Sequence, residues 1–182
     1  MKKTRYSLVQ RLLHWLIALL VFGLLAMGFT FWWLGYEGIN GLFGDELTNS
    51  FYMMHKSVGI LVFFLVVVRL LLFRFSPVPE YQPPLSGVER VISTTTHVLM
   101  YLLLIGIPIG GWLATSISGF PVQFFGWSQP GLDPANKELG NQLFLMHGIG
   151  GLVLLAVLLL HIGAGLKHWK MKDGIMKRIS LP

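Results

Sequence analysis

The chain has 182 residues, of which 54% are hydrophobic and 12% are charged, and its mean hydropathy is +0.66. This composition excludes an ordinary water-soluble domain. The absence of cysteine excludes disulfides, thiolate-held iron–sulfur clusters and covalently attached c-type haem. The net charge of +6 does not indicate nucleic acid, because the aromatic residues lie inside apolar blocks and not among the basic residues. We therefore expect a small membrane protein that contacts lipid and binds no nucleic acid.

Four apolar blocks follow one another along the chain, at about residues 8–34, 51–74, 88–114 and 141–169. Each block is long enough to cross a bilayer, which takes about 20 helical residues. Prolines within residues 76–84 prevent a continuous helix between the second and third blocks. Gly, Asn and Asp in residues 35–50 and 115–140 are typical of loops. The sequence therefore predicts an all-α membrane protein, a four-transmembrane-helix bundle that forms a single domain over residues 1–182.

The first block follows a basic start, as in a signal peptide, but it is too long and lacks a clear cleavage site after it. We therefore expect this block to remain as a membrane span. Basic residues near span ends are retained in the cytoplasm, and four alternating spans place every Lys and Arg except Lys56 and Lys137 on one side. This distribution predicts that both termini are cytoplasmic. Five acidic residues then lie on the outer side, namely Glu37, Asp45, Glu46, Asp133 and Glu138.

All six histidines fall inside the apolar blocks or at their edges, at His14, His55, His97, His147, His161 and His168. Ionisable residues are costly within a membrane and are usually functional there. The alternative is that each histidine is a neutral imidazole that forms a hydrogen bond between helices or contacts water at the membrane surface. Six histidines with related spacing favour a shared function.

The spacing of four histidines predicts two stacked pairs. His147 and His161 are 14 residues apart on one block, which places them on one helix face and about 21 Å apart along its axis. His55 matches the depth of His147, and His14 matches the depth of His161. We therefore predict an outer pair, His55 and His147, and an inner pair, His14 and His161.

Two imidazoles at each of two depths are typical of haem iron held by an axial histidine on each side. A zinc site, the alternative, more often gathers three or four ligands at one depth. Three glycines each follow one of these histidines by four residues, namely Gly59, Gly151 and Gly165. A small residue at that offset would let a flat macrocycle approach the helix, although close helix packing also selects glycine.

His97 competes with His14 for the inner ligand position, because both lie at a comparable depth. Bulky Tyr101 stands four residues after His97, where the other candidate ligands have a small residue. We therefore favour His14.

Three further residues are candidates for cofactor contacts. Arg69 lies 14 residues after His55, so it could pair with a haem propionate near the inner site or extend to the lipid headgroups. Lys56 could pair with an outer propionate or attract an anionic reductant. His168 could bind quinone or be an ordinary interfacial histidine.

Several short motifs are combined in this chain: His14-Trp15, His55-Lys56-Ser57-Val58-Gly59-Ile60, Val68-Arg69-Leu70, His97-Val98-Leu99-Met100-Tyr101-Leu102-Leu103 with Pro108, Phe125-Gly126-Trp127, and Lys167-His168-Trp169 followed by Lys172-Asp173-Gly174. Together with the spacing of the histidines, they resemble the bacterial cytochrome b561 family over almost the whole chain. The branch in question is also similar to the b-type haem subunits of membrane hydrogenases.

The resemblance implies a multi-pass protein of the bacterial inner membrane that holds two b haems. Their axial ligands carry over to His14, His55, His147 and His161, and quinone contact carries over to His168. Family members transfer electrons between an outer donor and the quinone pool, and some resemble superoxide:ubiquinone oxidoreductases. The acidic outer side disfavours an anionic donor.

Two other functions stay open at this stage. The chain could be a haem b anchor subunit that passes electrons for a peripheral dehydrogenase or hydrogenase. It could also be a haem-free transporter of metal ions or protons. The sequence does not decide whether the chain has oxidoreductase activity of its own, whether it has a redox partner protein, or whether it forms a homodimer.

Overall fold

A computed structural model describes residues 4–76 and 78–181. In chain order the elements are α1 (Leu8–Phe75), α2 (Gly87–Ile117), β1 (Val122–Phe124), β2 (Trp127–Gln129), α3 (Lys137–Met171) and the short 3-10 helix η1 (Ile175–Arg178). Within the described residues, α1, α2 and α3 are each long and apolar enough to cross a membrane. The prediction of a helical membrane protein is therefore confirmed.

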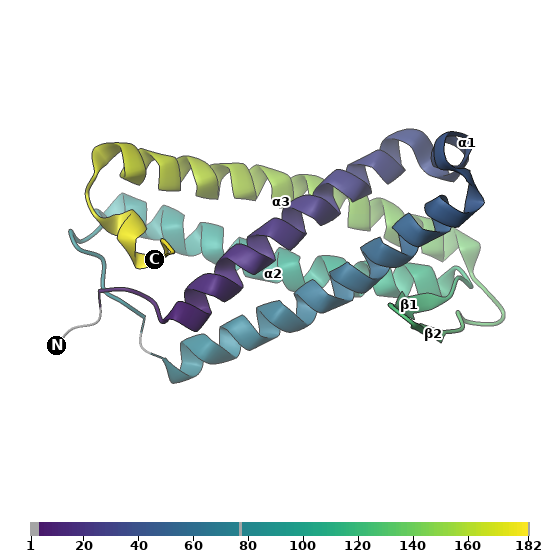
Figure 1. Cartoon of the computed structure of the whole chain (residues 1–182), viewed down its shortest axis with the longest axis horizontal. Coiled ribbons are helices and arrows are strands. Elements are labelled where there is room, and N and C mark those ends of the chain that lie inside the picture. The colour runs from purple at the N-terminus through teal and green to yellow at the C-terminus, as the bar shows by residue number, and fades with distance from the viewer. Residues whose placement is uncertain (1–3, 77, 182) are drawn as a thin grey trace.

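The 68-residue helix α1 contains two sharp bends, at Gly35 and Gly44. Their backbone angles, φ 64° and ψ 178° for Gly35 and φ 78° and ψ 168° for Gly44, belong to a region that essentially only glycine occupies. Figure 1 shows that the chain reverses there, so the part of α1 before the bends and the part after them form two arms running in opposite directions. The loop expected over residues 35–50 is wrong, because two glycines supply the turn and leave the intervening backbone helical.

The helices α2 and α3 contain the predicted spans at residues 88–114 and 141–169 and extend beyond them at both ends. A serine caps the start of α2, where the Ser86 hydroxyl accepts from the Glu89 amide and the Glu89 carboxylate accepts from the Ser86 amide. Such a capping box satisfies amide groups that a helix start leaves unpaired. The helix α2 therefore begins directly after the proline-rich connection.

The connection between α2 and α3 holds a small hairpin that the sequence did not predict. The strands β1 and β2 pair antiparallel, with Val122 opposite Gln129 and Phe124 opposite Trp127. Phe125, in the turn between them, has a positive φ of 51°. The hairpin lies at the same end of the molecule as the bends of α1 (Figure 1). The turn region of α1 and this hairpin therefore form one end of the bundle.

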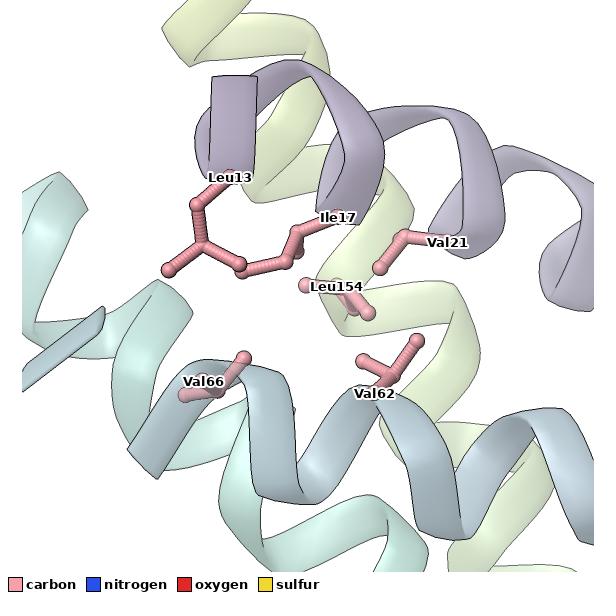
Figure 2. Packing of buried hydrophobic residues seen from close by; sticks show 6 residues of the cluster. All are labelled: Leu13, Ile17, Val21, Val62, Val66 and Leu154. Atoms are coloured by element: carbon pink, nitrogen blue, oxygen red, sulfur yellow. The ribbon is translucent and has the colours of Figure 1, made fainter. Parts of the chain in front are cut away.

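The buried core lies where the two arms of α1 meet α3. Figure 2 shows its six side chains pointing toward one another: Leu13, Ile17, Val21, Val62, Val66 and Leu154. Their four-residue spacing within each arm of α1 places them on one stripe of that arm. Many other apolar side chains face outward, such as Trp33, which is 89% exposed. That distribution suits a helix bundle surrounded by lipid.

The two ends of the described chain lie together, at the end of the bundle opposite the hairpin (Figure 1). Arg178 of η1 is buried, donates to the Pro79 carbonyl at 2.6 Å and lies 3.7 Å from the ring centre of Tyr81. Its own carbonyl accepts from the Tyr6 amide at 3.1 Å. These contacts tie the last residues to the start of α1 and to the connection before α2.

The bend at Gly35 gives a testable expectation. Gly35→Ala forces a β-carbon into a backbone region that side chains rarely adopt, and we expect it to lower the free energy of unfolding by about 1–3 kcal/mol. Gly41→Ala is the matched control, because Gly41 lies between the bends in helical backbone with no atom within 4 Å of its β-carbon position. Unfolding titrations in mixed detergent micelles measure both. Equal stability of the two variants would contradict the role of Gly35.

Candidate functional site

The structure brings His55 and His147 together, as predicted for the outer pair. His55 comes from the second arm of α1 and His147 from α3, and their ring centres are 6.0 Å apart with planes at 73°. The pair lies towards the end of the bundle that carries the hairpin and the bends of α1. Two helices that are far apart in sequence thus present one imidazole each to a common space.

Three histidines meet at the other depth. The ring centres of His14 and His161 are 6.2 Å apart with planes at 69°, and those of His97 and His161 are 5.2 Å apart with planes at 85°. Nδ1 of His97 lies 2.6 Å from the Ser93 carbonyl oxygen. Both candidates for the inner ligand position therefore face His161, one from α1 and the other from α2.

The distances within the outer and inner pairs match what a shared metal requires. An imidazole nitrogen lies about 2.0–2.1 Å from a bound metal ion, and the ring centre lies about 1.1 Å behind that nitrogen. Two imidazoles on opposite sides of one metal therefore have ring centres about 6.3 Å apart. The 5.2 Å between His97 and His161 is too short for that arrangement. No group of three or more His, Asp or Glu residues within residues 4–76 and 78–181 is placed to hold a metal ion.

An apolar cavity lies beside the outer pair. The residues around it include both histidines, Trp32, and the glycines Gly28, Gly59, Gly148 and Gly151. Two glycines predicted to admit a macrocycle, Gly59 and Gly151, therefore do line a space beside His55 and His147. Gly165 is placed differently, because Met176 Sδ of η1 lies 3.6 Å from the position of a β-carbon there.

Sequence reasoning missed two contacts that position the outer pair. Gly28 lies against His55, since a β-carbon there would be 3.4 Å from His55 Cε1. Nδ1 of His147 lies 2.9 Å from the carbonyl oxygen of Ile107 on α2. Both contacts cross between segments distant in sequence, and no spacing motif marks them. The helix α2 supplies neither histidine of the outer pair, yet it contacts His147 directly.

Arg69 lies inside the bundle and does not extend to the lipid headgroups. It is 8% exposed, and its guanidinium donates to the Tyr101 hydroxyl at 3.1 Å and to the Gln10 carbonyl at 2.8 Å. It also lies over the ring of Phe73, 5.1 Å from the ring centre. No carboxylate among the described residues pairs with it. A buried guanidinium without an anion is costly, so this position suits an anionic group of a cofactor.

Lys56 and its neighbour Ser57 fasten the hairpin to the second arm of α1. The Lys56 ammonium donates to the Pro121 carbonyl at 3.0 Å, and the Ser57 hydroxyl accepts from the Phe125 amide at 2.7 Å. The same hydroxyl donates to the Met53 carbonyl at 2.8 Å. The residues directly after His55 therefore position the loop that covers this end of the bundle.

His168 forms a local pair near the end of α3. Its Nδ1 lies 2.6 Å from Oδ2 of Asp173, and both side chains are largely buried. The other carboxylate oxygen of Asp173 accepts from the Ile175 amide at 3.0 Å. This contact orients the start of η1 and leaves Nε2 of His168 available for another partner.

The apolar helices define a membrane protein in which imidazoles from different helices are paired at two levels. A family model described as prokaryotic cytochrome b561 matches residues 5–180. The chain therefore belongs to the prokaryotic cytochrome b561 family. It is a membrane haem protein, with haem of the b type.

Individual relatives agree with this assignment. The chain is 34% identical to cytochrome b561 homolog 2 of Escherichia coli (strain K12) over 123 residues, which cover 68% of the chain and 62% of that relative, less than two thirds of its length. It is 29% identical to the probable superoxide oxidase CybB of Yersinia pestis over 176 residues, covering 96% and 95% of the two chains. It is 23% identical to cytochrome b561 homolog 1 of Escherichia coli (strain K12) over 180 residues, 96% of each chain.

The pair of His168 and Asp173 predicts a pH dependence. Burial acts to raise the pKa of Asp173, but the hydrogen bonds from His168 and the Ile175 amide outweigh it and lower this pKa below its ordinary value of 3.8. A lowered carboxylate pKa stabilises the fold above the ordinary value, and that contribution is lost as the pH falls through the folded value. Asp173→Asn should therefore be less stable than the wild type at about pH 7, with the difference shrinking below about pH 4.

Thermal unfolding in detergent across this pH range measures the difference. Asp133→Asn removes an exposed carboxylate of the connection between β2 and α3 and serves as the control. A deficit of the Asp173→Asn variant that stays constant down to the lowest pH would contradict the ionic contribution.

Proposed function

We propose that this protein is a di-haem cytochrome of the bacterial inner membrane that transfers electrons between an outer donor and the quinone pool. The single observation that carries the proposal is the pairing of imidazoles at 6.0 and 6.2 Å at two levels of the bundle. Family membership supports b-type haem as the cofactor that these imidazoles hold. One domain, the four-helix bundle, contains both sites.

The proposed membrane arrangement has four crossings, namely the two arms of α1, α2 and α3, with both termini in the cytoplasm. The reversal of α1 at Gly35 and Gly44 supports two crossings within that helix. Basic residues such as Arg5, Arg11 and Arg178 gather at the end where the described termini lie, and a basic end is retained in the cytoplasm. The outer pair then lies towards the extracytoplasmic side.

We propose His55 and His147 as ligands of the outer haem, and His14 and His161 as ligands of the inner haem. Haem supplies reversible one-electron transfer between its ferric and ferrous states. With two of these imidazoles as its ligands, each haem iron would favour electron transfer over binding of oxygen. Gly59 and Gly151 leave room beside the outer pair. Met176 lies against Gly165, so we place the inner haem among other residues.

The buried guanidinium of Arg69 supports an anionic partner at the inner level. Its guanidinium donates to the Tyr101 hydroxyl and to the Gln10 carbonyl. We propose that it faces a propionate of the inner haem and favours the reduced state there. We propose that Lys56, which follows His55 and donates to the Pro121 carbonyl, supplies a positive charge near the outer haem.

The path between the two levels is short enough for direct electron transfer. His147 and His161 lie about 21 Å apart along α3, and the edges of two macrocycles held there would be closer than their irons. The apolar core of Figure 2 belongs to the same helices between these two levels. Its buried side chains are apolar, so they offer no polar group that would carry protons between the two levels.

Ubiquinone is the proposed acceptor, with His168 at its site. Nδ1 of His168 is engaged by Asp173 at 2.6 Å, which fixes the ring and leaves Nε2 to contact a quinone oxygen. Superoxide is the donor that the relative named probable superoxide oxidase CybB suggests. The acidic outer side repels an anion at long range, so we expect the rate of this reaction to rise with ionic strength as salt screens the repulsion.

Haem content tests the proposal. A reduced-minus-oxidised visible spectrum and a pyridine haemochrome count of the purified protein should give two b haems per chain. Replacing any proposed ligand removes one of the four metal–imidazole bonds, so His14→Ala, His55→Ala, His147→Ala and His161→Ala should each lose one haem. His97→Ala is the matched control and should keep both.

The outcomes separate the class of protein from the ligand assignment. Absence of haem from the wild-type protein would overturn the proposed function. Loss of haem from His97→Ala with retention in His14→Ala would leave the protein a cytochrome but would make His97, and not His14, the inner ligand. Reduction of ubiquinone by superoxide in the purified protein would establish activity of the chain itself, and failure to do so would point to a partner dehydrogenase as donor.

A further inference from the structure

We propose that Ile107 and Gly111, about one turn apart on α2, form a positioning segment that sets the orientation and donor strength of His147. This inference rests on the proposed function, in which His147 is a ligand of the outer haem. The segment supplies no ligand of that haem. It acts through two contacts with the imidazole of His147, one polar and one steric.

The polar contact fixes the tautomer of His147. Its Nδ1 lies 2.9 Å from the Ile107 carbonyl oxygen, and because a carbonyl oxygen can only accept, Nδ1 carries the proton and donates it. The lone pair is then on Nε2, at the far side of the ring, where a metal would bind. Such a bond also makes the imidazole a stronger electron donor to the metal.

The steric contact explains why position 111 is glycine. A β-carbon there would lie 2.8 Å from both Cε1 and Nδ1 of His147, closer than carbon and ring atoms can approach without displacement. The hydrogen atom of Gly111 leaves the edge of the ring in contact with the α2 backbone. The ring can therefore reach the Ile107 carbonyl only because residue 111 has no side chain.

A second glycine provides the same close approach from α3. A β-carbon on Gly150 would lie 3.0 Å from Cγ1 of Ile107, so this glycine lets α3 pack tightly on α2 beside the hydrogen bond. Small residues at helix contacts permit such approach within membranes. Gly111 accommodates His147, and Gly150 accommodates Ile107, so the contact is reciprocal.

The two histidines of the outer pair differ in whether Nδ1 has a hydrogen-bond partner. Nδ1 of His55 is buried and has no hydrogen-bond partner among the described residues, whereas Nδ1 of His147 is bonded. The orientation and donor strength that α2 imposes therefore act through His147 alone. A stronger donor stabilises ferric iron, so the segment lowers the reduction potential of the outer haem.

The test is Gly111→Ala, with Gly110→Ala as the matched control on the same turn of α2. Gly110 has no atom within 4 Å of its β-carbon position. Potentiometric titration of the purified holoprotein, followed in the visible spectrum, should resolve two components in the wild type. Gly111→Ala should shift one component to higher potential, or release that haem alone, and leave the other component unchanged. Gly110→Ala should match the wild type.

The outcomes separate this inference from the proposed function. Two haems in Gly111→Ala with both potentials unchanged would overturn the positioning role and leave the proposed function intact. An equal shift in Gly110→Ala would also overturn it. Absence of haem from the wild type overturns the proposed function instead. If Gly111→Ala does not fold, Gly150→Ala decides. A shift of one component to higher potential in that variant supports the inference, and no shift overturns it.

Discussion

The rest of this structure depends on one interaction, the pairing of imidazoles that come from different helices. Neutral imidazole is tolerated in an apolar bundle, but placing four of them in two pairs with centres 6.0 and 6.2 Å apart needs every crossing segment to hold a fixed depth and rotation. The two arms of α1 supply one member of each pair, and α3 supplies the other two. Each arm is held to α3 through the shared core of Val21, Val62 and Leu154.

The bends of α1 and the packing of α2 meet that requirement in different ways. Gly35 and Gly44 turn the chain within helical backbone, so the histidines on the two arms face α3 at opposite depths. The helix α2 contacts one histidine of each level, through Ile107 at His147 and through His97 beside His161. It therefore contacts imidazoles at both levels, and precise placement of these rings is what the proposed haem ligation requires.

Much of this arrangement could be predicted from the sequence, because it follows from helical periodicity. The 14-residue interval between His147 and His161 gives one face and two depths without any tertiary information. The hairpin at β1 and β2 and the helical turn region of α1 were not predictable in this way. Polar and glycine-rich segments indicate that the chain turns, but the backbone angles that achieve the turn depend on packing.

Contacts that involve a backbone carbonyl or a glycine could not be predicted from the sequence either. Nothing in the pattern marks the Ile107 carbonyl as a partner of His147 or distinguishes Gly111 from Gly110, although only Gly111 lies against the ring. The direction of the Arg69 side chain could not be predicted for a similar reason. Its length allowed either the headgroups or the interior, and the choice was made by the positions of Tyr101 and the Gln10 carbonyl.

The most direct test of the central claim is a low-temperature electron paramagnetic resonance spectrum of the oxidised wild-type protein. Each iron should be low-spin ferric and held by two imidazoles whose planes are nearly perpendicular, at 73° and 69° in the two pairs. Perpendicular planes leave the iron d orbitals close in energy, so the account predicts two strongly anisotropic low-spin signals. A high-spin signal, or the rhombic low-spin signal of parallel imidazoles, would contradict it.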